Sequence, residues 1–200
     1  MAPRPGLDKV KIIDEAIRLA DRVGYENLGW GMVATALGVK PPSLYNHLAG
    51  FEELKNEIAV LGARQLWETF VAAAEGLRGT QALKAVGRAY VRYAREHPSL
   101  YRASLKAPAA DAVELTALAQ KILDVLFAAM DPWHLAPSQG VHAIRIVRSA
   151  LHGFVSIEAA GGFGLPESLD DTLEALLTTL VHGLSHLNDE AQTIDKEELE

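Results

Sequence analysis

Residues 37–48 read LGVKPPSLYNHL, and this stretch decides how the N-terminal part of the chain folds. Gly38 supplies the left-handed backbone that a tight turn between two helices commonly needs. Pro41 has a fixed φ and no amide donor, so it suits the first turn of a following helix. Leu44 and Leu48 lie four residues apart and therefore share one face of that helix. The stretch predicts a helix-turn-helix whose second helix buries these two leucines.

The other side chains of this second helix point away from the leucines. Ser43, Tyr45, Asn46 and His47 offer hydroxyl, amide and imidazole groups outward. A short helix with an apolar back and a hydrogen-bonding front suits the major groove of DNA. An ordinary helical hairpin inside an all-α protein is the alternative, because two short helices joined by a glycine turn also occur without DNA.

Composition indicates a globular chain of 200 residues without disulfides. Hydrophobic residues make up 49% and charged residues 22%, there is no cysteine, and neither a signal peptide nor a membrane-spanning run is visible. The formal net charge is −7, but residues 1–55 carry seven basic and seven acidic residues, so the acidic surplus lies in residues 56–200. We expect a cytoplasmic protein whose N-terminal part, neutral over residues 1–55, binds non-specific DNA poorly and depends on a defined DNA site.

Apolar residues recur at helical spacing along the rest of the chain, and no segment shows the alternation of a strand. The predicted fold class is all-α, with about nine helices. We expect an N-terminal three-helix helix-turn-helix domain at residues 1–52 and a helical regulatory and dimerisation domain at 53–188. An acidic, disordered tail is expected at 189–200, which carries six acidic residues and one lysine.

The predicted helix limits follow from caps and breaks. Asp8 is a candidate N-cap of the first helix, and Ser138 and Ser168 are candidate N-caps of the last two. The helices are expected at about 8–23, 30–36 and 41–48, from 51 to a break at 76–80, at 83–97, briefly after 98, and at 115–129, 137–161 and 168–187.

Several positions around the opening stretch form a specific combination. They are Ile13, Ala16, Ala20 and Gly24, then Val33-Ala34 and Leu37-Gly38-Val39, the run from Ser43 to Leu48, and Glu53-Leu54. On these residues, the stretch 7–54 resembles the DNA-binding domain of the TetR family of transcriptional regulators. Residues 148–164, RSALHGFVSIEAAGGFG, resemble the C-terminal regulatory domain of a TetR subgroup named for a Trp-His-Gly motif. Leu151 stands where the Trp would be, whereas His152-Gly153 match.

The resemblance implies that each copy of the chain places residues 41–47 in a major groove. Ser43 and Asn46 would then face bases, while phosphates would be met by Lys40, Tyr45 and His47. Arg4 would lie in an N-terminal arm that reaches toward the minor groove, although a frayed terminus is the alternative. The full set expected to bind DNA is Lys40, Pro41, Pro42, Ser43, Tyr45, Asn46, His47, Trp30, Lys55 and Arg4.

Two positions depart from the family pattern. Gly29 stands where a Thr or Ser usually caps the second helix beside a phosphate, and Phe51 stands where a Lys usually meets the DNA backbone. Trp30 either offers its indole N–H to a phosphate instead or packs against the first helix. Lys55, one turn after Phe51, could partly replace the missing lysine.

The resemblance also implies a ligand pocket in the body and a four-helix bundle between two copies. The residues expected to line the pocket are Trp67, Tyr90, Tyr93, Tyr101, Leu105, Leu123, Phe127, Arg145 and His152. The alternative is that these side chains simply pack in the core. The leucine stripe at 173–187 is wider than one partner helix needs. The expected dimer interface comprises Leu151, Gly153, Phe154, Leu173, Leu177, Leu180 and Leu184.

Motifs for catalysis and metal binding are missing from the sequence. There is no nucleophile elbow, phosphate-cradling loop or dinucleotide fingerprint, so we expect neither an enzyme nor a cofactor. Four histidines fall on the last two predicted helices: His142, His152, His182 and His186. They could bind zinc, but HGLSH lacks the Glu of a catalytic zinc helix and no cysteine assists, so we expect hydrogen-bonded histidines and no metal.

We therefore interpret the chain as a homodimeric, ligand-responsive transcriptional repressor. Its partners would be a pseudo-palindromic DNA operator with half-sites about one helical turn apart, a second copy of itself, and a small apolar or aromatic effector. The effector would favour a spacing between the N-terminal domains of the two copies that no longer fits the DNA. The alternative, motivated by Gly29 and Phe51, is a module of the same fold that binds a ligand or protein and has lost DNA binding.

Overall fold

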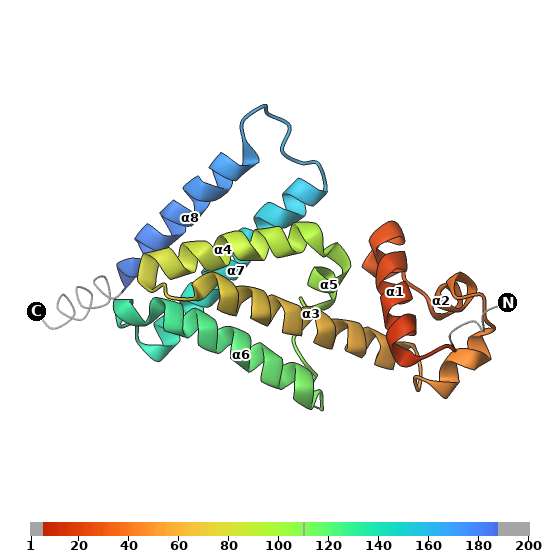
Figure 1. The fold of residues 1–200 in the computed structure, drawn as a ribbon. Helices are drawn as coiled ribbons and strands as arrows, with labels where there is room; N and C mark the ends of the chain where they lie inside the picture. Colours follow the sequence, from red (N-terminus) through yellow and green to blue (C-terminus); the bar gives the residue numbers. More distant parts are fainter. Residues whose placement is uncertain (1–5, 110, 188–200) are drawn as a thin grey trace, which may run out of the picture. The chain divides into compact units, whose positions relative to one another are not determined.

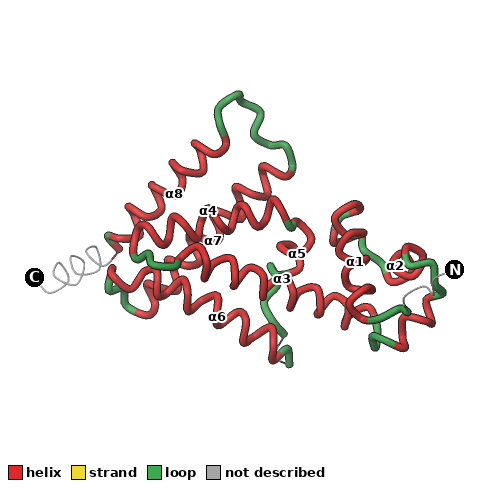
Figure 2. The backbone as a smooth tube through the Cα atoms, viewed as in Figure 1, coloured by secondary structure: helices red, strands yellow, loops and turns green. Residues whose placement is uncertain are grey.

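The computed structural model describes residues 6–109 and 111–187, and within them every regular element is a helix (Figures 1 and 2). The α-helices are α1 (Lys9–Val23), α2 (Trp30–Ala36), α3 (Phe51–Ala74), α4 (Gly79–Glu96), α5 (Pro98–Ala103), α6 (Val113–Met130), α7 (Pro137–Ala159) and α8 (Leu169–Ser185). Three 3-10 helices accompany them: η1 (Tyr25–Asn27), η2 (Pro41–Asn46) and η3 (Asp131–Trp133). The predicted all-α class is confirmed, and the nine predicted helices correspond to the eight α-helices and η2.

The chain divides into two compact units. The first unit consists of residues 1–65 and 96–118, and the second of residues 66–95 and 119–200. The domain limits expected at residues 52 and 188 stay predictions, and both Arg4 and the tail at 189–200 lie outside the described residues. None of the described helices is long and apolar enough to cross a membrane.

The first helix of the chain begins and ends as its sequence predicts. The Asp8 side chain accepts a hydrogen bond from the amide of Lys11 at 2.8 Å, which satisfies one of the free donors at the start of α1. Gly24 has a φ of +88°, and its N–H donates to the carbonyl of Ala20 as α1 ends. Ile12 and Ala16 are fully buried on the inner face of the helix.

The second helix of the predicted helix-turn-helix is a 3-10 helix rather than an α-helix. Gly38 has a φ of +68°, so the predicted turn is confirmed. Pro41 and Pro42 have no amide donor, and the first N–H of the segment, that of Ser43, bonds to the carbonyl of Lys40 three residues back at 2.9 Å. The segment η2 is only six residues long, so little length is left for α-helical bonds to replace these tighter ones.

Short α5 packs within the first unit, against α1, η1 and α3. The amide of Ser99 donates to the Asp21 carboxylate at 3.2 Å. Gly62 of α3 faces the backbone of α5, and a Cβ added to this glycine would meet the carbonyl oxygen of Leu100 at 2.5 Å. Since only a glycine leaves room for this approach, Gly62 lets the two backbones meet.

The core of the second unit lies where α4, α7 and α8 pack together (Figure 1). Leu151 of α7 and Leu177 of α8 are 2% and 1% exposed. Both side chains lie against Gly87 of α4, where a Cβ would clash with Leu177. The close approach of α4 to the last two helices therefore depends on a missing side chain at this position.

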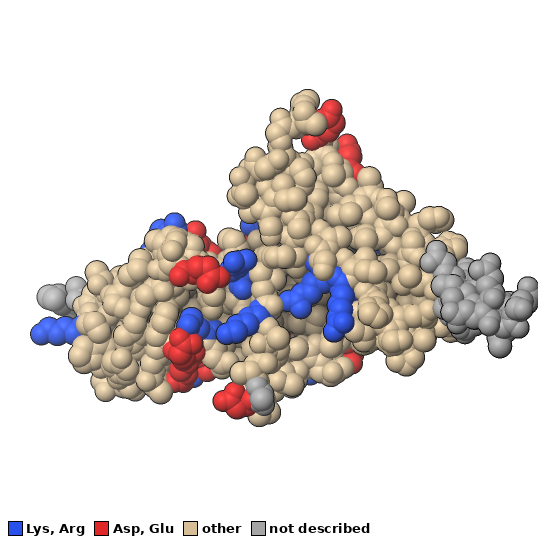
Figure 3. All heavy atoms as spheres, turned by 180° about the vertical axis from the view of Figure 1, so that it is seen from behind, with Lys and Arg blue, Asp and Glu red and all other residues tan. Residues whose placement is uncertain are grey.

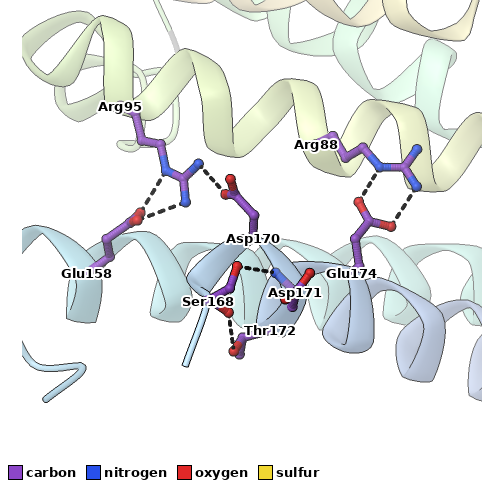
Figure 4. Close-up of polar contacts among 8 residues, drawn as sticks. All are labelled: Arg88, Arg95, Glu158, Ser168, Asp170, Asp171, Thr172 and Glu174. Carbon is purple, nitrogen blue, oxygen red and sulfur yellow. Dashed lines mark hydrogen bonds and ion pairs between the residues drawn. The ribbon is translucent and has the colours of Figure 1, made fainter. Parts of the chain in front are cut away.

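Ion pairs run along the outside of the same packing (Figure 4). Arg88 of α4 forms a two-pronged pair with Glu174 of α8. Further along α4, Arg95 meets Glu158 at 2.8 Å and Asp170 at 3.0 Å. Exposed ion pairs contribute only about 0.2–1 kcal/mol each to stability. We therefore expect these pairs to align α8 along α4 and to supply only a small part of the free energy of unfolding.

One of the two serine caps predicted for the last helices is correct. The Ser168 side chain accepts a hydrogen bond from the amide of Asp171 at 3.2 Å and caps α8 (Figure 4). The prediction for Ser138 is wrong, because Pro137 is the first residue of α7 and Ala136 precedes it as the cap residue. Proline at the first helical position already provides a favourable start, so Ser138 falls inside the first turn.

Candidate nucleic-acid interface

The segment from Lys40 to His47 is held by its apolar side and leaves its polar side in solvent. Leu44 is 0% exposed and Leu48 2%, which confirms the predicted buried face. Tyr45 is 57% exposed. The other exposed side chains are Lys40, Pro41, Pro42 and Asn46, while Ser43 and His47 are half-buried. The structure therefore brings these predicted DNA-contacting residues into one continuous, accessible segment.

Most basic side chains around this segment are already paired with acids. Lys9 of α1 lies 2.8 Å from Glu57 and 3.2 Å from Glu53 of α3, and the hydrogen bond to Glu57 raises the pKa of Lys9 above its ordinary value. Other pairs in the same unit are Lys11 with Asp8, Arg18 and Arg22 with Glu15, Lys55 with Glu52, and Arg64 with Glu114.

Lys40 differs from these basic residues. It is exposed and makes no ion pair among the described residues. On the face drawn in Figure 3, acidic side chains lie beside several of the basic ones. The described residues of the first unit thus present little unpaired positive charge, and Lys40 is the strongest candidate among them for a phosphate contact.

The Trp30 ring packs against two other aromatic rings of this region, those of Tyr45 and Phe51. The Trp30 ring lies 5.4 Å from the Tyr45 ring and 6.4 Å from the Phe51 ring, measured between centroids. The indole Nε1 of Trp30 is buried and has no hydrogen-bond partner among the described residues. Lys55 pairs with Glu52 at 2.5 Å and lies 5.2 Å from the Phe51 ring centroid, so its ammonium group is engaged within the unit.

The residues expected to line a ligand pocket fall in both units. Tyr101 and Leu105 belong to the first unit and the other seven to the second. In the second unit Tyr90 and Tyr93 are buried, Trp67, Leu123 and His152 are half-buried, and Phe127 and Arg145 are exposed. Burial raises the pKa of the Tyr93 phenol well above its ordinary value. Their role in ligand binding stays a prediction.

An open groove of about 550 Å³ lies in the second unit, at the C-terminal ends of α3 and α6. Its apolar lining includes Val71, Leu77 and Phe127, which are 45%, 36% and 36% exposed. Its charged lining consists of Glu75, Arg78 and Asp131. Of the expected pocket residues, Phe127 alone lines this groove. Sequence reasoning missed the others, because periodicity does not tell which apolar side chain remains exposed.

The residues expected at the dimer interface lie mostly inside the protomer. Five of the seven are at most 5% exposed: Leu151, Phe154, Leu173, Leu177 and Leu184. Gly153 and Leu180 are half-buried. The five buried side chains have little surface left to cover, so any contact with a second copy must come from their neighbours.

Such neighbours lie on the outer face of α7. Ile146 is 44% exposed and Ile157 46%. Gly153 lies between them, and a Cβ added there would meet nothing within 4 Å. Positions 146, 150, 153 and 157 follow helical spacing and share one face, and this spacing was the signal that could have found Ile146 and Ile157.

The histidines of α8 form a pair on the helix surface. The rings of His182 and His186 lie 4.9 Å apart, and both residues are exposed. In the described parts of the chain, no group of three or more His, Cys, Asp or Glu side chains is placed to hold a metal ion.

Comparisons with known proteins agree with this architecture. A family model described as the tetracyclin repressor-like C-terminal domain matches residues 83–180. The uncharacterised HTH-type transcriptional regulator YobS of Bacillus subtilis is 30% identical over 189 residues, which cover 92% of this chain and 96% of that protein. The uncharacterised HTH-type transcriptional regulator Rv0681 of Mycobacterium tuberculosis is 31% identical over 156 residues, or 78% and 72% of the two chains.

Solved structures show the same fold. A TetR variant from Acinetobacter baumannii AYE, determined in complex with minocycline, matches with a TM-score of 0.68 at 21% identity, over 91% of this chain and 98% of that one. PfmR, a TetR family transcriptional regulator from Thermus thermophilus, matches with a TM-score of 0.64 at 22% identity, over 86% and 97%. The chain therefore belongs to the TetR family of helix-turn-helix transcriptional regulators, and it is a DNA-binding regulator rather than an enzyme.

Proposed function

We propose that this regulator is a homodimeric, ligand-responsive repressor that acts in the cytoplasm on a pseudo-palindromic operator. The observation that carries the proposal is the segment from Lys40 to His47, which is anchored by two buried leucines and exposes a lysine, a tyrosine and an asparagine together. Ser43 and Asn46 are assigned to base edges, and Lys40, Tyr45 and His47 to phosphates. Two copies related by a two-fold axis would read half-sites about one helical turn apart.

Operator binding is tested with a duplex selected from a random DNA library by the wild-type chain. Tyr45→Ala is expected to abolish retention of this duplex in a gel-shift assay, with the fold intact. Lys40→Ala is expected to weaken binding and to lower the slope of log affinity against log salt by roughly one. Lys106→Ala removes the same charge from another exposed site and serves as the matched control. Unchanged retention by Tyr45→Ala would contradict the proposed interface, and no binding at low salt would favour a module that has lost DNA binding.

Dimerisation is assigned to the outer faces of α7 and α8. The exposed Ile146 and Ile157, with Gly153 between them, offer an apolar strip on which a second copy can pack closely. Ile146→Glu is expected to give a monomer in sedimentation analysis and to weaken operator binding. Leu165→Glu, at a residue that is 80% exposed outside the helices, is the control and should remain a dimer. A dimeric Ile146→Glu variant would place the interface elsewhere.

Ligand response is supported by the groove in the second unit and by the minocycline bound to the A. baumannii neighbour. The groove has the volume of small-molecule sites and combines apolar walls with three charged side chains. We propose that a small apolar or aromatic effector binds here. It would favour a dimer in which the spacing between the two N-terminal domains no longer fits the operator. Thermal-shift screening identifies candidates, and Phe127→Ala tests whether they occupy the groove. A ligand whose thermal shift is unaffected by Phe127→Ala binds elsewhere.

The direction of regulation is tested in cells. A reporter gene behind the selected operator is expected to be expressed more strongly when the regulator is absent than when it is present. The opposite change would make the protein an activator.

A further inference from the structure

Four side chains from three elements form one cluster next to the recognition segment. Trp30 begins α2, Tyr45 lies in η2, and Phe51 and Lys55 lie in the first turn and a half of α3. We call these four residues the aromatic cluster. The Trp30 ring is tilted by 59° against the Tyr45 ring and by 63° against the Phe51 ring, with centroids 5.4 Å and 6.4 Å away. The Lys55 ammonium lies 5.2 Å from the centre of the Phe51 ring.

The position of the indole nitrogen argues against a direct phosphate contact by Trp30. Its Nε1 is buried and makes no hydrogen bond within the described residues. A phosphate oxygen would need an exposed N–H to reach it at hydrogen-bond distance. An unpaired buried N–H is unfavourable for folding, so the benefit of Trp30 must come from its ring faces and not from its donor.

Tyr45 is the exposed side chain whose ring packs against the Trp30 ring. It is 57% exposed, and it lies on a short 3-10 segment. The buried Leu44 within this segment and the buried Leu48 just after it hold the backbone but not the phenol ring. Tilted aromatic pairs are favourable beyond the area they bury. A ring held in place before DNA arrives loses less rotational freedom on binding than a freely turning one.

We propose that Trp30 is a positioning residue for operator binding, which acts through the ring of Tyr45, while Phe51 packs against Trp30 and supports it. The inference rests on the proposed contact between Tyr45 and DNA. It also gives Phe51 a function: at the position where the family resemblance implies a phosphate-binding lysine, this chain carries a ring that packs against Trp30. The Lys55 ammonium lies over that ring.

The test is a double-mutant cycle on the full chain, with the selected operator duplex and fluorescence anisotropy at several salt concentrations. Trp30→Leu is expected to weaken binding roughly 2- to 12-fold, which is the loss of one aromatic pair. All four variants are compared at the lowest salt concentration, where the residual binding of Tyr45→Ala is measurable by anisotropy. In the Tyr45→Ala background the same substitution is expected to have no further effect on this residual binding, because the residue through which Trp30 acts is gone. Trp133→Phe, in the second unit, is the control and should bind like the wild type.

Trp30→Phe separates the ring from the N–H. We expect it to bind the operator close to wild type, with the same salt slope and no lower melting temperature, because it keeps a ring and removes an unpaired donor. A marked loss of affinity together with a salt slope lower by about one would instead show that the indole N–H meets a phosphate.

Three results would overturn the inference. One is the phosphate signature of Trp30→Phe just described. Another is a Trp30→Leu effect that is undiminished in the Tyr45→Ala background, which would mean that Trp30 acts independently of Tyr45. The last is unchanged binding by Tyr45→Ala itself, which would contradict the proposed interface as well. Phe51→Leu provides a second route if Trp30→Leu does not fold, and its effect must also vanish in the Tyr45→Ala background.

Discussion

Gly62→Ala is the substitution for which the structure makes the most definite prediction. A Cβ at this position would lie 2.5 Å from the carbonyl oxygen of Leu100 and 3.1 Å from its carbonyl carbon, whereas ordinary contacts are 3.4–4 Å. The obstacle is backbone and not a side chain that can turn aside. Helix α5 is further held by the hydrogen bond from Ser99 to Asp21 and by the ion pair from Arg102 to Glu26. To accept the methyl group, α3 and α5 must separate by about 1 Å.

The expected cost follows from two opposing effects. Overpacking of this kind typically destabilises by about 1–3 kcal/mol. Replacing a helical glycine with alanine stabilises by up to about 1 kcal/mol through helix propensity. Gly31→Ala in α2 is the matched control, because a Cβ there meets nothing within 4 Å and only the propensity gain applies. We therefore expect the free energy of unfolding of Gly62→Ala to lie about 1–3 kcal/mol below that of Gly31→Ala.

The assay is thermal unfolding of the full chain followed by circular dichroism at one fixed protein concentration, since the melting temperature of an oligomer depends on concentration. For a chain of this size the difference corresponds to a melting temperature about 2–12 °C lower than that of the control. If Gly62→Ala melts at or above Gly31→Ala, the close contact of α3 with α5 is refuted, and with it the packing of α5 in the first unit.

Three further predictions concern the core, a cap and pH. Leu177→Ala is expected to lower the free energy of unfolding, measured in urea, by about 2–5 kcal/mol, because it opens a cavity at a 1% exposed site. Ser168→Ala should cost about 1 kcal/mol in the same assay through loss of the α8 cap, and a change near zero would show that the cap is not used. Hydrogen bonds from the Ala49 amide and from Lys9 lower the pKa of Glu53 below its ordinary value of 4.5. The folded chain then binds fewer protons than the unfolded chain, so stability should fall as pH drops below about 4.5, and Glu53→Gln should flatten this pH dependence.

Local signals in the sequence were sufficient for most of the helix limits. Asp8 caps α1, Gly38 adopts the left-handed turn, and Leu44 and Leu48 are buried, as their spacing predicts. Each of these features depends on interactions within a few residues, which a sequence displays directly. The 3-10 character of η2 does not follow from the helix-start signal of Pro41, because it depends on the two amide donors that Pro41 and Pro42 lack.

Contacts between distant segments could not be derived in this way. Nothing in the sequence near Trp30 indicates that its ring packs against Tyr45 and Phe51. The dimer interface shows the same limit, because a wide leucine stripe does not reveal which of its members the protomer keeps for its own core. Leu177 lies inside the protomer and Ile146 outside it.

By itself, then, the sequence determined that this chain is all-helical, that residues 37–48 turn between two helices, and that the N-terminal part resembles a DNA-binding domain. Only the tertiary structure decided which cations remain unpaired, which apolar side chains remain exposed, and that Trp30 packs against Tyr45 instead of presenting its N–H. The physical reason is that helix formation and turns are controlled by bonds within a few residues, whereas burial and pairing depend on segments that the chain brings together from far apart.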